Sequence, residues 1–238
     1  MKLALIGYGK MGKAIEAIAI SRGHEICARY TSAHPLTEGN LVHADVAIEF
    51  STPELATRHM RICLEAGMPV VTGTTGWYNA FDEMQALSQA CGTALFTASN
   101  FSLGVNIFFA INEQLARIMA QHQDYKVSIS EVHHVHKKDA PSGTAISLAT
   151  QILEQMPHLK SWSLGTPEQV SSSTLPIESI RMDEVPGTHD VVYHSAVDTI
   201  SIKHTAHDRS GFALGAVLAA EFLRGKQGVY GMKDLLQF

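Results

Sequence analysis

The sequence predicts an α/β fold in which a parallel sheet covered by helices is followed by a second α+β domain built on a mostly antiparallel sheet. Three observations carry this prediction. Short apolar runs alternate with helical patterns through the first part of the chain, and a glycine-rich turn follows the first run. After about residue 104 the alternation ends and several strand patterns gather in one region, which favours antiparallel pairing.

The first part alternates predicted strands and helices with short connections, which is typical of a parallel sheet. One helix has a clear start and stop, because Thr52 stands at its cap, Pro53 at its first position and Gly67 at its end. The expected strands are 2–6, 24–30, 45–50, 69–73 and 93–98. The expected helices are 10–23, 51–67 and 77–92.

The second part begins with a helical pattern, which an alternating strand pattern follows. Residues 157–175 are rich in Ser, Thr and Pro, so we expect a loop there. The last two strands are expected to join through a tight turn at 196–198. The expected strands are 125–134, 176–182, 190–196 and 198–206, and the expected helices are 105–120, 143–156, 209–225 and 232–238.

Composition excludes several classes of protein. The 238 residues are 45% hydrophobic and 17% charged, which is typical of a globular protein, and the net charge of -5 argues against nucleic-acid binding through a basic surface. No apolar run approaches the ~20 residues that cross a bilayer, and the run after Met1 is too short for a secretory signal. Cys27, Cys63 and Cys91 are dispersed, which predicts reduced thiols and a cytoplasmic location.

The turn after the first strand is a full G-x-G-x-x-G motif. In such a motif the first glycine allows a tight turn, the second lets the backbone approach a pyrophosphate, and the third lets the helix pack on the strand. Because it follows a strand and opens a helix, it predicts a Rossmann-type dinucleotide site, although a structural glycine turn would give the same pattern. The residues of this turn are Gly7, Tyr8, Gly9, Lys10, Met11 and Gly12.

The end of the second strand bears on which nucleotide is bound. An Asp or Glu about 20 residues after the glycine motif would bind the ribose 2'-hydroxyl of NADH. This chain instead has Arg29, with Thr31 and Ser32 beside it. A cation and hydroxyls suit a 2'-phosphate, so NADPH is favoured over NADH, but an exposed arginine without a ligand is an equal alternative.

Two later turns follow predicted strands, where ligands collect in parallel sheets. One is GTTG at 73–76 and the other is ASNFSLG at 98–104. Their small polar side chains could hydrogen-bond a ribose or an amide, and ordinary turn chemistry is the alternative.

The stretch EVHHVHKKDAPSGTA, residues 131–145, concentrates histidines and lysines before a predicted helix start. On a strand His134 and His136 would share one face and His133 the other, without an acidic or Cys partner at metal-site spacing, so we predict no metal. A solvated strand end is one alternative. The other is an anion site with a histidine near its unperturbed pKa, a ready general acid.

We expect the helix after this stretch to begin with Pro141 in its first turn and with Asp139 or Ala140 near the cap. Ser142, Gly143 and Thr144 would then expose N–H and hydroxyl groups to an anion.

Residues 131–145 match every fixed position of E-x-H-H-x-x-K-x-D-A-P-S-G-T-A, and so resemble the signature of the dihydrodipicolinate reductase family. GYGKMG, GTTG, ASNFSLGVN and the C-terminal RSGFALGAVLAAEFLRGKQGVYGMKDLL resemble the same family in order and spacing. The resemblance implies reduction of 4-hydroxy-tetrahydrodipicolinate to tetrahydrodipicolinate by NADPH or NADH, in lysine and diaminopimelate biosynthesis.

The resemblance also implies roles for single residues. His133 would donate a proton, with Lys137 as a second donor. His134 would contact the substrate, a small cyclic dicarboxylate. One carboxylate of this substrate would be held by Ser142, Gly143 and Thr144. The cofactor would be held by the glycine turn and by Gly73, Thr74, Thr75, Ala98, Ser99, Asn100 and Phe101.

The resemblance extends to domains and assembly. Residues 1–104 and 210–238 would form the dinucleotide-binding domain. Residues 105–209 would bind substrate and join a homotetramer through their sheets.

Three departures from the family stand out. Ala28 and Arg29 occupy a position that is often acidic, and the connection from there to residue 45 is short enough to lack one strand–helix element. A Ser/Thr-rich stretch after Trp162 replaces a Gly/Arg-rich loop, and only VPGTH at 185–189 resembles the turn beyond it. Two rival functions remain. One is an L-aspartate dehydrogenase, which would not need HHxxKxDAPSGT. The other is a non-catalytic NAD(P) sensor, which could lose His133 and Lys137.

Overall fold

The computed structural model describes residues 1–208 and 210–237. The chain forms two compact units, of which one joins Met1–Leu103 to the C-terminal segment and the other comprises Gly104–Asp208. The predicted boundaries at 104 and 209 lie within one residue of this division, but residues 209 and 238 themselves lie outside the described residues. Which unit binds substrate or joins subunits stays a prediction.

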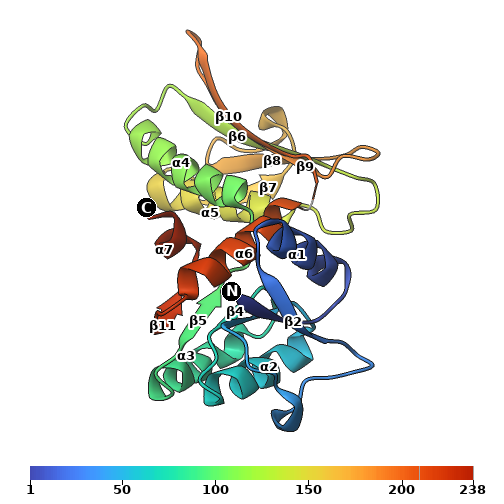
Figure 1. Cartoon of the computed structure of the whole chain (residues 1–238). Coiled ribbons are helices and arrows are strands. Elements are labelled where there is room, and N and C mark those ends of the chain that lie inside the picture. The colour runs from blue at the N-terminus through green and yellow to red at the C-terminus, as the bar shows by residue number, and fades with distance from the viewer. Residues whose placement is uncertain (209, 238) are drawn as a thin grey trace. The chain divides into compact units, whose positions relative to one another are not determined.

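The first unit is built on a six-stranded sheet in the order β11-β5-β4-β3-β1-β2, and every pairing in it is parallel (Figure 1). The predicted parallel sheet is therefore confirmed. Its strands are β1 (Lys2–Ile6), β2 (Glu25–Tyr30), β3 (Val46–Glu49), β4 (Val70–Thr72), β5 (Ala94–Thr97) and β11 (Gly228–Tyr230). Its helices are α1 (Lys10–Ser21), α2 (Pro53–Glu65), α3 (Phe81–Ala90), α6 (Ser210–Leu223) and α7 (Met232–Leu236).

Helices cover both faces of this sheet, because successive side chains of a strand point to opposite faces. Leu3 and Leu5 of β1 belong to the core that α1 and α6 complete. Ala4 and Ile6, one residue away in each case, belong to the core that α2 completes through Met60. This two-sided burial explains why the strands are almost continuously apolar.

The connection from β2 to β3 contains one short 3-10 helix, Glu38–Asn40, and no other helix or strand among its described residues. The expected missing element is thus confirmed, and β2 becomes the edge of the sheet next to β1. The strand order turns at β1 and β3, and ligands of such sheets bind where the order turns, at the carboxyl ends of the strands. The three-residue β11 was not predicted, because so short a run carries no periodicity.

The second unit has a five-stranded sheet in the order β10-β9-β6-β8-β7. Two pairings are antiparallel, β10 with β9 and β9 with β6, and two are parallel, β6 with β8 and β8 with β7. The strands are β6 (Lys126–His133), β7 (Ser161–Leu164), β8 (Thr174–Arg181), β9 (Gly187–His194) and β10 (Thr199–Ala206). The sheet is mixed, so the predicted mostly antiparallel sheet was wrong in this detail.

The error came from residues 157–175, which were predicted as a loop. They contain β7 and the 3-10 helix Pro167–Gln169. The chain leaves β6, passes through helix α5 (Gly143–Gln155) and only then enters β7 and β8. Such a long crossover allows strands to pair in parallel, whereas a hairpin cannot.

Helices α4 (Leu103–Met119) and α5 pack on this sheet in a single core (Figure 1). Phe108, Leu148 and Ile152 of the helices meet Ile129 and Tyr193 of the sheet in that core. Each such apolar side chain contributes about 1.5–3 kcal/mol when it is fully buried. In the described part of the chain, none of the helices has both the length and the apolar character to cross a membrane.

Candidate active site

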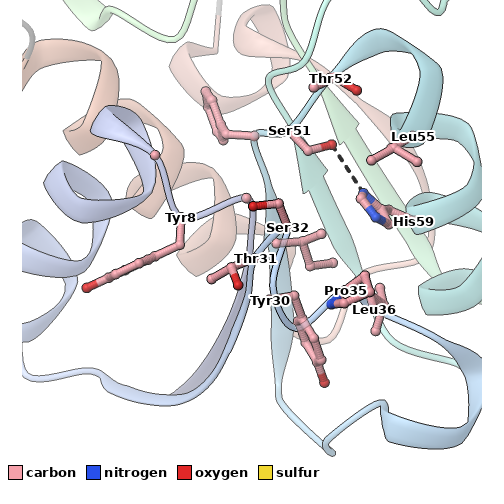
Figure 2. A pocket seen from close by; sticks show the side chains of 14 residues that line it. Tyr8, Tyr30, Thr31, Ser32, Pro35, Leu36, Ser51, Thr52, Leu55 and His59 are labelled. Carbon is pink, nitrogen blue, oxygen red and sulfur yellow. Dashed lines mark hydrogen bonds between the residues drawn. The ribbon is translucent and has the colours of Figure 1, made fainter.

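A cavity of about 520 Å³ opens at the carboxyl ends of the first three strands, where the strand order turns (Figure 2). Of the predicted cofactor residues, Gly7, Tyr8 and Gly9 line it, and Thr31 and Ser32 line it from the end of β2. The other lining residues are Ile6, Tyr30, Pro35, Leu36, Phe50, Ser51, Thr52, Leu55 and His59.

The three glycines of the motif are needed for different reasons. A Cβ on Gly7, whose φ is +90°, would overlap the carbonyl oxygen of Phe50, and one on Gly12 would overlap the carbonyl of Gly7. Both glycines therefore serve the packing of the chain itself. A Cβ on Gly9 would meet nothing within 4 Å, so the protein's own packing does not require glycine there. The bare backbone faces open cavity, as a site for a pyrophosphate requires.

The start of α1 fits the same ligand. Gly9 is its N-cap and offers no side-chain cap, and its first turn has no acidic residue. N–H groups at a helix start lack partners within the helix and attract anions. Lys10 and Met11, also predicted to hold the cofactor, stand in this first turn, Lys10 exposed and Met11 half-buried.

Behind the cavity lies a buried carboxylate that was not predicted. Glu49, the last residue of β3, is fully buried, and it accepts hydrogen bonds from Ser51 N–H at 3.0 Å and Thr72 Oγ1 at 2.7 Å. His59 Nδ1 lies 3.5 Å from Glu49 Oε1, and Ser51 N–H also donates to Thr74 Oγ1 at 2.9 Å. Figure 2 shows Ser51 and His59 linked by a hydrogen bond.

Burial alone would raise the pKa of Glu49, but its hydrogen bonds with His59, Ser51, Thr72 and Thr74 outweigh burial and lower the pKa. The carboxylate is therefore ionised and ties the end of β3 to the GTTG turn after β4. An acidic residue inside the apolar run VAIEF was the signal that could have found it, since an unpaired charge is rarely buried.

The predicted residues of the GTTG turn have unequal roles. Thr74 is buried in the Glu49 network, and Thr75 is exposed. A Cβ on Gly73 would overlap the ring of Phe50, so glycine is required there by packing. None of the three lines the cavity described above.

The predicted residues after β5 lie at the same edge of the sheet, because β5 is parallel to β4. Phe101 is buried, with its ring centroid 5.5 Å from that of Phe50. Asn100 Oδ1 accepts a hydrogen bond from Ser102 N–H at 2.9 Å, Ala98 is half-buried and Ser99 is exposed. Ser99 is thus the most accessible of this group.

Arg29 is not a free cation. Its guanidinium forms two hydrogen bonds with the carboxylate of Glu16 on α1, one of them from Nε to Oε2 at 3.1 Å. Tyr8 donates its hydroxyl to the same carboxylate, and the Arg29 guanidinium lies 5.8 Å from the centre of the Tyr8 ring. Glu16 was not predicted, since nothing in the sequence places α1 against the end of β2.

The second unit holds a second buried carboxylate, at Glu131 of β6. The strand register explains its surroundings, because Ser179 of β8 and His189 of β9 both stand directly opposite Glu131. Ser179 Oγ donates to it at 2.6 Å, Arg181 Nη2 at 3.3 Å, and Ser142 N–H at 3.1 Å to each oxygen.

Burial alone would raise the pKa of Glu131, but interactions with His189, Ser142 and Ser179 outweigh burial and hold the pKa far below its usual range. This carboxylate therefore stays ionised and joins β6, β8, β9 and the start of α5.

His133, the predicted proton donor, is the last residue of β6 and is only 8% exposed. Its Nδ1 lies 3.4 Å from Glu131 Oε2, and its ring meets that of His189 edge-on with centroids 5.1 Å apart. A Cβ on Gly187 would lie 3.0 Å from His133 Nε2, so glycine leaves room for the ring.

Burial is the main cause that lowers the pKa of His133. Glu131 opposes it and the charges of His189, Lys137 and Arg181 add to it, so that the pKa is about 4. This value lies below the unperturbed pKa of 6.5 that the general-acid interpretation of the stretch assumed, because burial was not visible in the sequence. The ring is neutral at neutral pH.

The rest of the histidine stretch leaves the strand. Because β6 ends at His133, the expected shared strand face of His134 and His136 was wrong, and both stand in the turn that follows. Lys137 Nζ donates to Asp139 Oδ2 at 2.8 Å. His134 and Lys137 are half-buried and therefore partly accessible.

The start of α5 differs from the expected one. Ser142, not Asp139 or Ala140, is the N-cap, since its Oγ accepts a hydrogen bond from Ala145 N–H, and Pro141 precedes the helix. Ser142 is buried and its N–H donates to Glu131, so its predicted exposure was wrong.

Gly143 and Thr144 in the first turn remain available to an anion. Gly143 is exposed, Thr144 is half-buried, and the first turn has no acidic residue.

Sequence spacing suggested no acidic partner for a metal, yet ligand atoms of Glu131, His133 and His189 lie within 4.8 Å of one another. The donor set does not favour a cation. Both Glu131 oxygens already accept hydrogen bonds, one of them from the Arg181 guanidinium, and His189 Nε2 is bonded to Ser142 Oγ at 3.0 Å. A second cation would meet the repulsion of this guanidinium. The cluster is better suited to moving protons.

Comparisons with known proteins agree with the resemblance of the motifs. Family models described as dihydrodipicolinate reductase, N-terminus and C-terminus, match residues 1–101 and 104–236. A Christiangramia forsetii protein named 4-hydroxy-tetrahydrodipicolinate reductase is 46% identical over 99% of this chain and 98% of its own length. A Rickettsia bellii protein of the same name is 34% identical over 95% of this chain and 90% of its own.

The fold has a counterpart among solved structures. The dipicolinate-bound dihydrodipicolinate reductase from Paenisporosarcina sp. TG-14 superposes with a TM-score of 0.79 at 22% identity and covers 98% of each chain.

Proposed function

The chain belongs to the dihydrodipicolinate reductase family, and we propose that it reduces 4-hydroxy-tetrahydrodipicolinate to tetrahydrodipicolinate with NADPH or NADH, on the route to diaminopimelate and lysine. The observation that carries the proposal is the cluster around Glu131. It places a buried histidine beside a helix start with open N–H groups. A reaction that protonates a ring carbon of a dicarboxylate requires both, a proton donor and a site for a carboxylate.

The nucleotide supplies a hydride when it is bound, and this chain's residues hold it. Gly9 and the start of α1 provide the open backbone for the pyrophosphate, and the cavity beyond has apolar walls for a flat ring. We assign Gly73–Thr75 and Ala98–Phe101 to the nicotinamide end, because they follow the next strands at the same edge of the sheet.

The dicarboxylate is held by charge and by backbone donors. Gly143 and Thr144 offer N–H groups at the start of α5 to one carboxylate, and Ser142 shapes this turn from within instead of contacting the ligand. His134 and Lys137 add hydrogen-bond donors nearby.

The 4-hydroxyl and a hydrogen of a neighbouring ring carbon first leave as water. His133 then gives a proton to the ring carbon next to the one that accepts the hydride, and Lys137 is the second donor. A neutral imidazole is a poor acid, so the substrate itself must raise its pKa. Two carboxylates brought beside His133 favour the imidazolium, which offsets the effect of burial. Proton uptake is thereby coupled to substrate binding.

The assembly and location follow the family resemblance. We propose a cytoplasmic homotetramer that uses the sheet of the second unit. In support, α4 and α5 share one core with that sheet, while β10 keeps exposed side chains such as Ile200, 37% exposed. No role in nucleic-acid or membrane binding is proposed. Sedimentation velocity should give four chains, and a monomer would contradict the assembly.

One assay tests the reaction. Freshly condensed aspartate semialdehyde and pyruvate provide the substrate. Oxidation of the nucleotide is followed by the loss of the absorbance of its reduced form. We expect oxidation that depends on both the substrate and the chain. Correctly folded protein that gives no turnover with either nucleotide would overturn the proposal, and would favour a sensor or a different reductase.

A further inference from the structure

The end of β2 carries an ion pair where a nucleotide-binding sheet usually carries a single charge. Arg29 and Glu16 come from β2 and α1, and two hydrogen bonds join them. Their side chains are unequally accessible, 42% exposed for Arg29 and 13% for Glu16. The carboxylate is thus the anchored partner, and the guanidinium is the one that solvent reaches.

Tyr8 connects this pair to the cavity. It lines the cavity, and its hydroxyl donates to the Glu16 carboxylate. Arg29 lies within 5.8 Å of its ring centre and directly precedes Tyr30, Thr31 and Ser32, which all line the cavity. Glu16 and Arg29 do not line the cavity themselves, so the pair stands behind the wall that Tyr8 forms, beside the region that would hold the adenine ribose.

The pair leaves this wall without net charge. Hydrogen bonds from Arg29, and then from Tyr8, lower the pKa of Glu16, so the carboxylate is ionised at neutral pH. The hydrogen bond to Glu16 raises the pKa of Arg29. One negative and one positive charge thus coexist beside the ribose.

The two nucleotides differ at this wall by one group. NADPH has a 2'-phosphate, which a free arginine attracts and a free carboxylate repels. NADH has a 2'-hydroxyl instead, which can donate a hydrogen bond to a carboxylate. We propose that Glu16 is the residue that sets the nucleotide preference. By holding Arg29, it cancels the attraction for a 2'-phosphate, and the chain accepts both nucleotides.

Binding measurements test this without turnover. Dissociation constants for NADH and NADPH, from nucleotide fluorescence, are compared in the wild type, Glu16→Gln and Arg29→Ala. A charge-assisted hydrogen bond is worth about 1.5–3 kcal/mol, or roughly tenfold or more in affinity. We therefore expect Glu16→Gln to tighten NADPH by about tenfold and NADH by less than about twofold.

Arg29→Ala moves the ratio the other way, weakening NADPH by about tenfold relative to NADH, because Glu16 is left as an unbalanced negative charge. Glu25→Gln is the matched control, since Glu25 is exposed at the opposite end of β2, and it should leave the ratio unchanged. The Glu16→Gln shift should also shrink as salt is added, because salt screens exposed charges.

The inference rests on the proposed function only for the choice of ligand, so their failures are separable. Equal effects of Glu16→Gln on both nucleotides, with turnover intact, would overturn the inference alone. The expected ratios without turnover would support it and overturn the proposed reaction. Binding of neither nucleotide to folded wild type would overturn both. Melting temperatures identify a misfolded Glu16→Gln, in which case the Arg29→Ala ratio decides.

Discussion

Each unit contains a fully buried carboxylate on a central strand. Glu49 ends β3 in the first unit, and Glu131 stands two residues before the end of β6 in the second. Both have pKa values that hydrogen bonds lower against the effect of burial. Their neighbours differ. Glu49 is held mainly by hydroxyl and backbone groups, with His59 at 3.5 Å, whereas Glu131 has a guanidinium and two histidines around it.

The difference shows how one side chain can serve geometry in one place and proton chemistry in another. The hydroxyl network of Glu49 fixes where two turns stand. The network of Glu131, with its guanidinium and histidines, also sets the electrostatic field at His133, the proposed proton donor. Changes at the two carboxylates should therefore affect different steps, binding of nucleotide for Glu49 and turnover for Glu131.

The largest effect is expected at His133, because it is the proposed proton donor. General-acid help is typically worth about 10²–10⁴ in rate, so His133→Gln should lower kcat by about that factor while nucleotide affinity stays near that of the wild type. Steady-state kinetics and fluorescence titration measure the two. His136→Gln, an exposed histidine of the same stretch, is the matched control. An unchanged kcat would remove His133 from the mechanism.

Glu131→Gln should be next, with kcat lowered by about 10²-fold and little change in nucleotide affinity. The amide keeps the shape but removes the charge that opposes burial at His133, and it leaves the Arg181 guanidinium without its counterion. Breaking such a pair costs about 3–5 kcal/mol in stability, to be read from urea unfolding.

Glu178→Gln is the control for that variant, since Glu178 belongs to β8 but is exposed. A loss of stability without any change in kcat or in its pH profile would show that Glu131 acts only in folding.

How far the sequence alone leads depends on the distance along the chain between the partners. The glycine turn and the start of α5 are local, so their motifs could be recognised, and the parallel sheet followed from strand–helix alternation. Glu131, Arg181 and His189 meet only through the register of β6 with β8 and β9. That register could not be predicted while residues 157–175 were taken as a loop and the sheet as mostly antiparallel.

Burial set the second limit. His133 lies on the same strand face as Glu131, but the sequence does not show that α5 and its cap cover that face. The pKa of the histidine and the engagement of Ser142 both depend on this packing. The same holds for Glu16, which meets Arg29 only when α1 lies against β2.

Glu49→Gln should affect the first unit instead. Its amide would place donors against the donors of Ser51 and Thr72, which costs about 1–3 kcal/mol and loosens the turns beside the cavity. We expect nucleotide affinity to fall by about tenfold, with kcat at saturating nucleotide nearly unchanged. Glu25→Gln should change neither. A kcat loss as large as that of Glu131→Gln would break the contrast between the two carboxylates.

The smallest expected effect is on the pH dependence of stability. His133 has a pKa of about 4 in the folded chain against 6.5 when unperturbed, so the unfolded chain takes up a proton first as the pH falls. Stability should therefore decrease from about pH 6.5 down to about pH 4. Glu49 and Glu131 act in the same direction below their unfolded pKa of 4.5, since their folded pKa values are lowered.

His133→Gln separates the histidine from the carboxylates. Each pKa unit corresponds to about 1.4 kcal/mol, so removing His133 should make the loss of unfolding free energy over this window smaller by about 1–3 kcal/mol. Urea unfolding at a series of pH values measures it. The remaining loss, confined to the more acidic end, would then belong to the carboxylates. An identical pH dependence in the variant would show that the His133 ring titrates alike in the folded and unfolded chain, and that burial does not hold it in a neutral state.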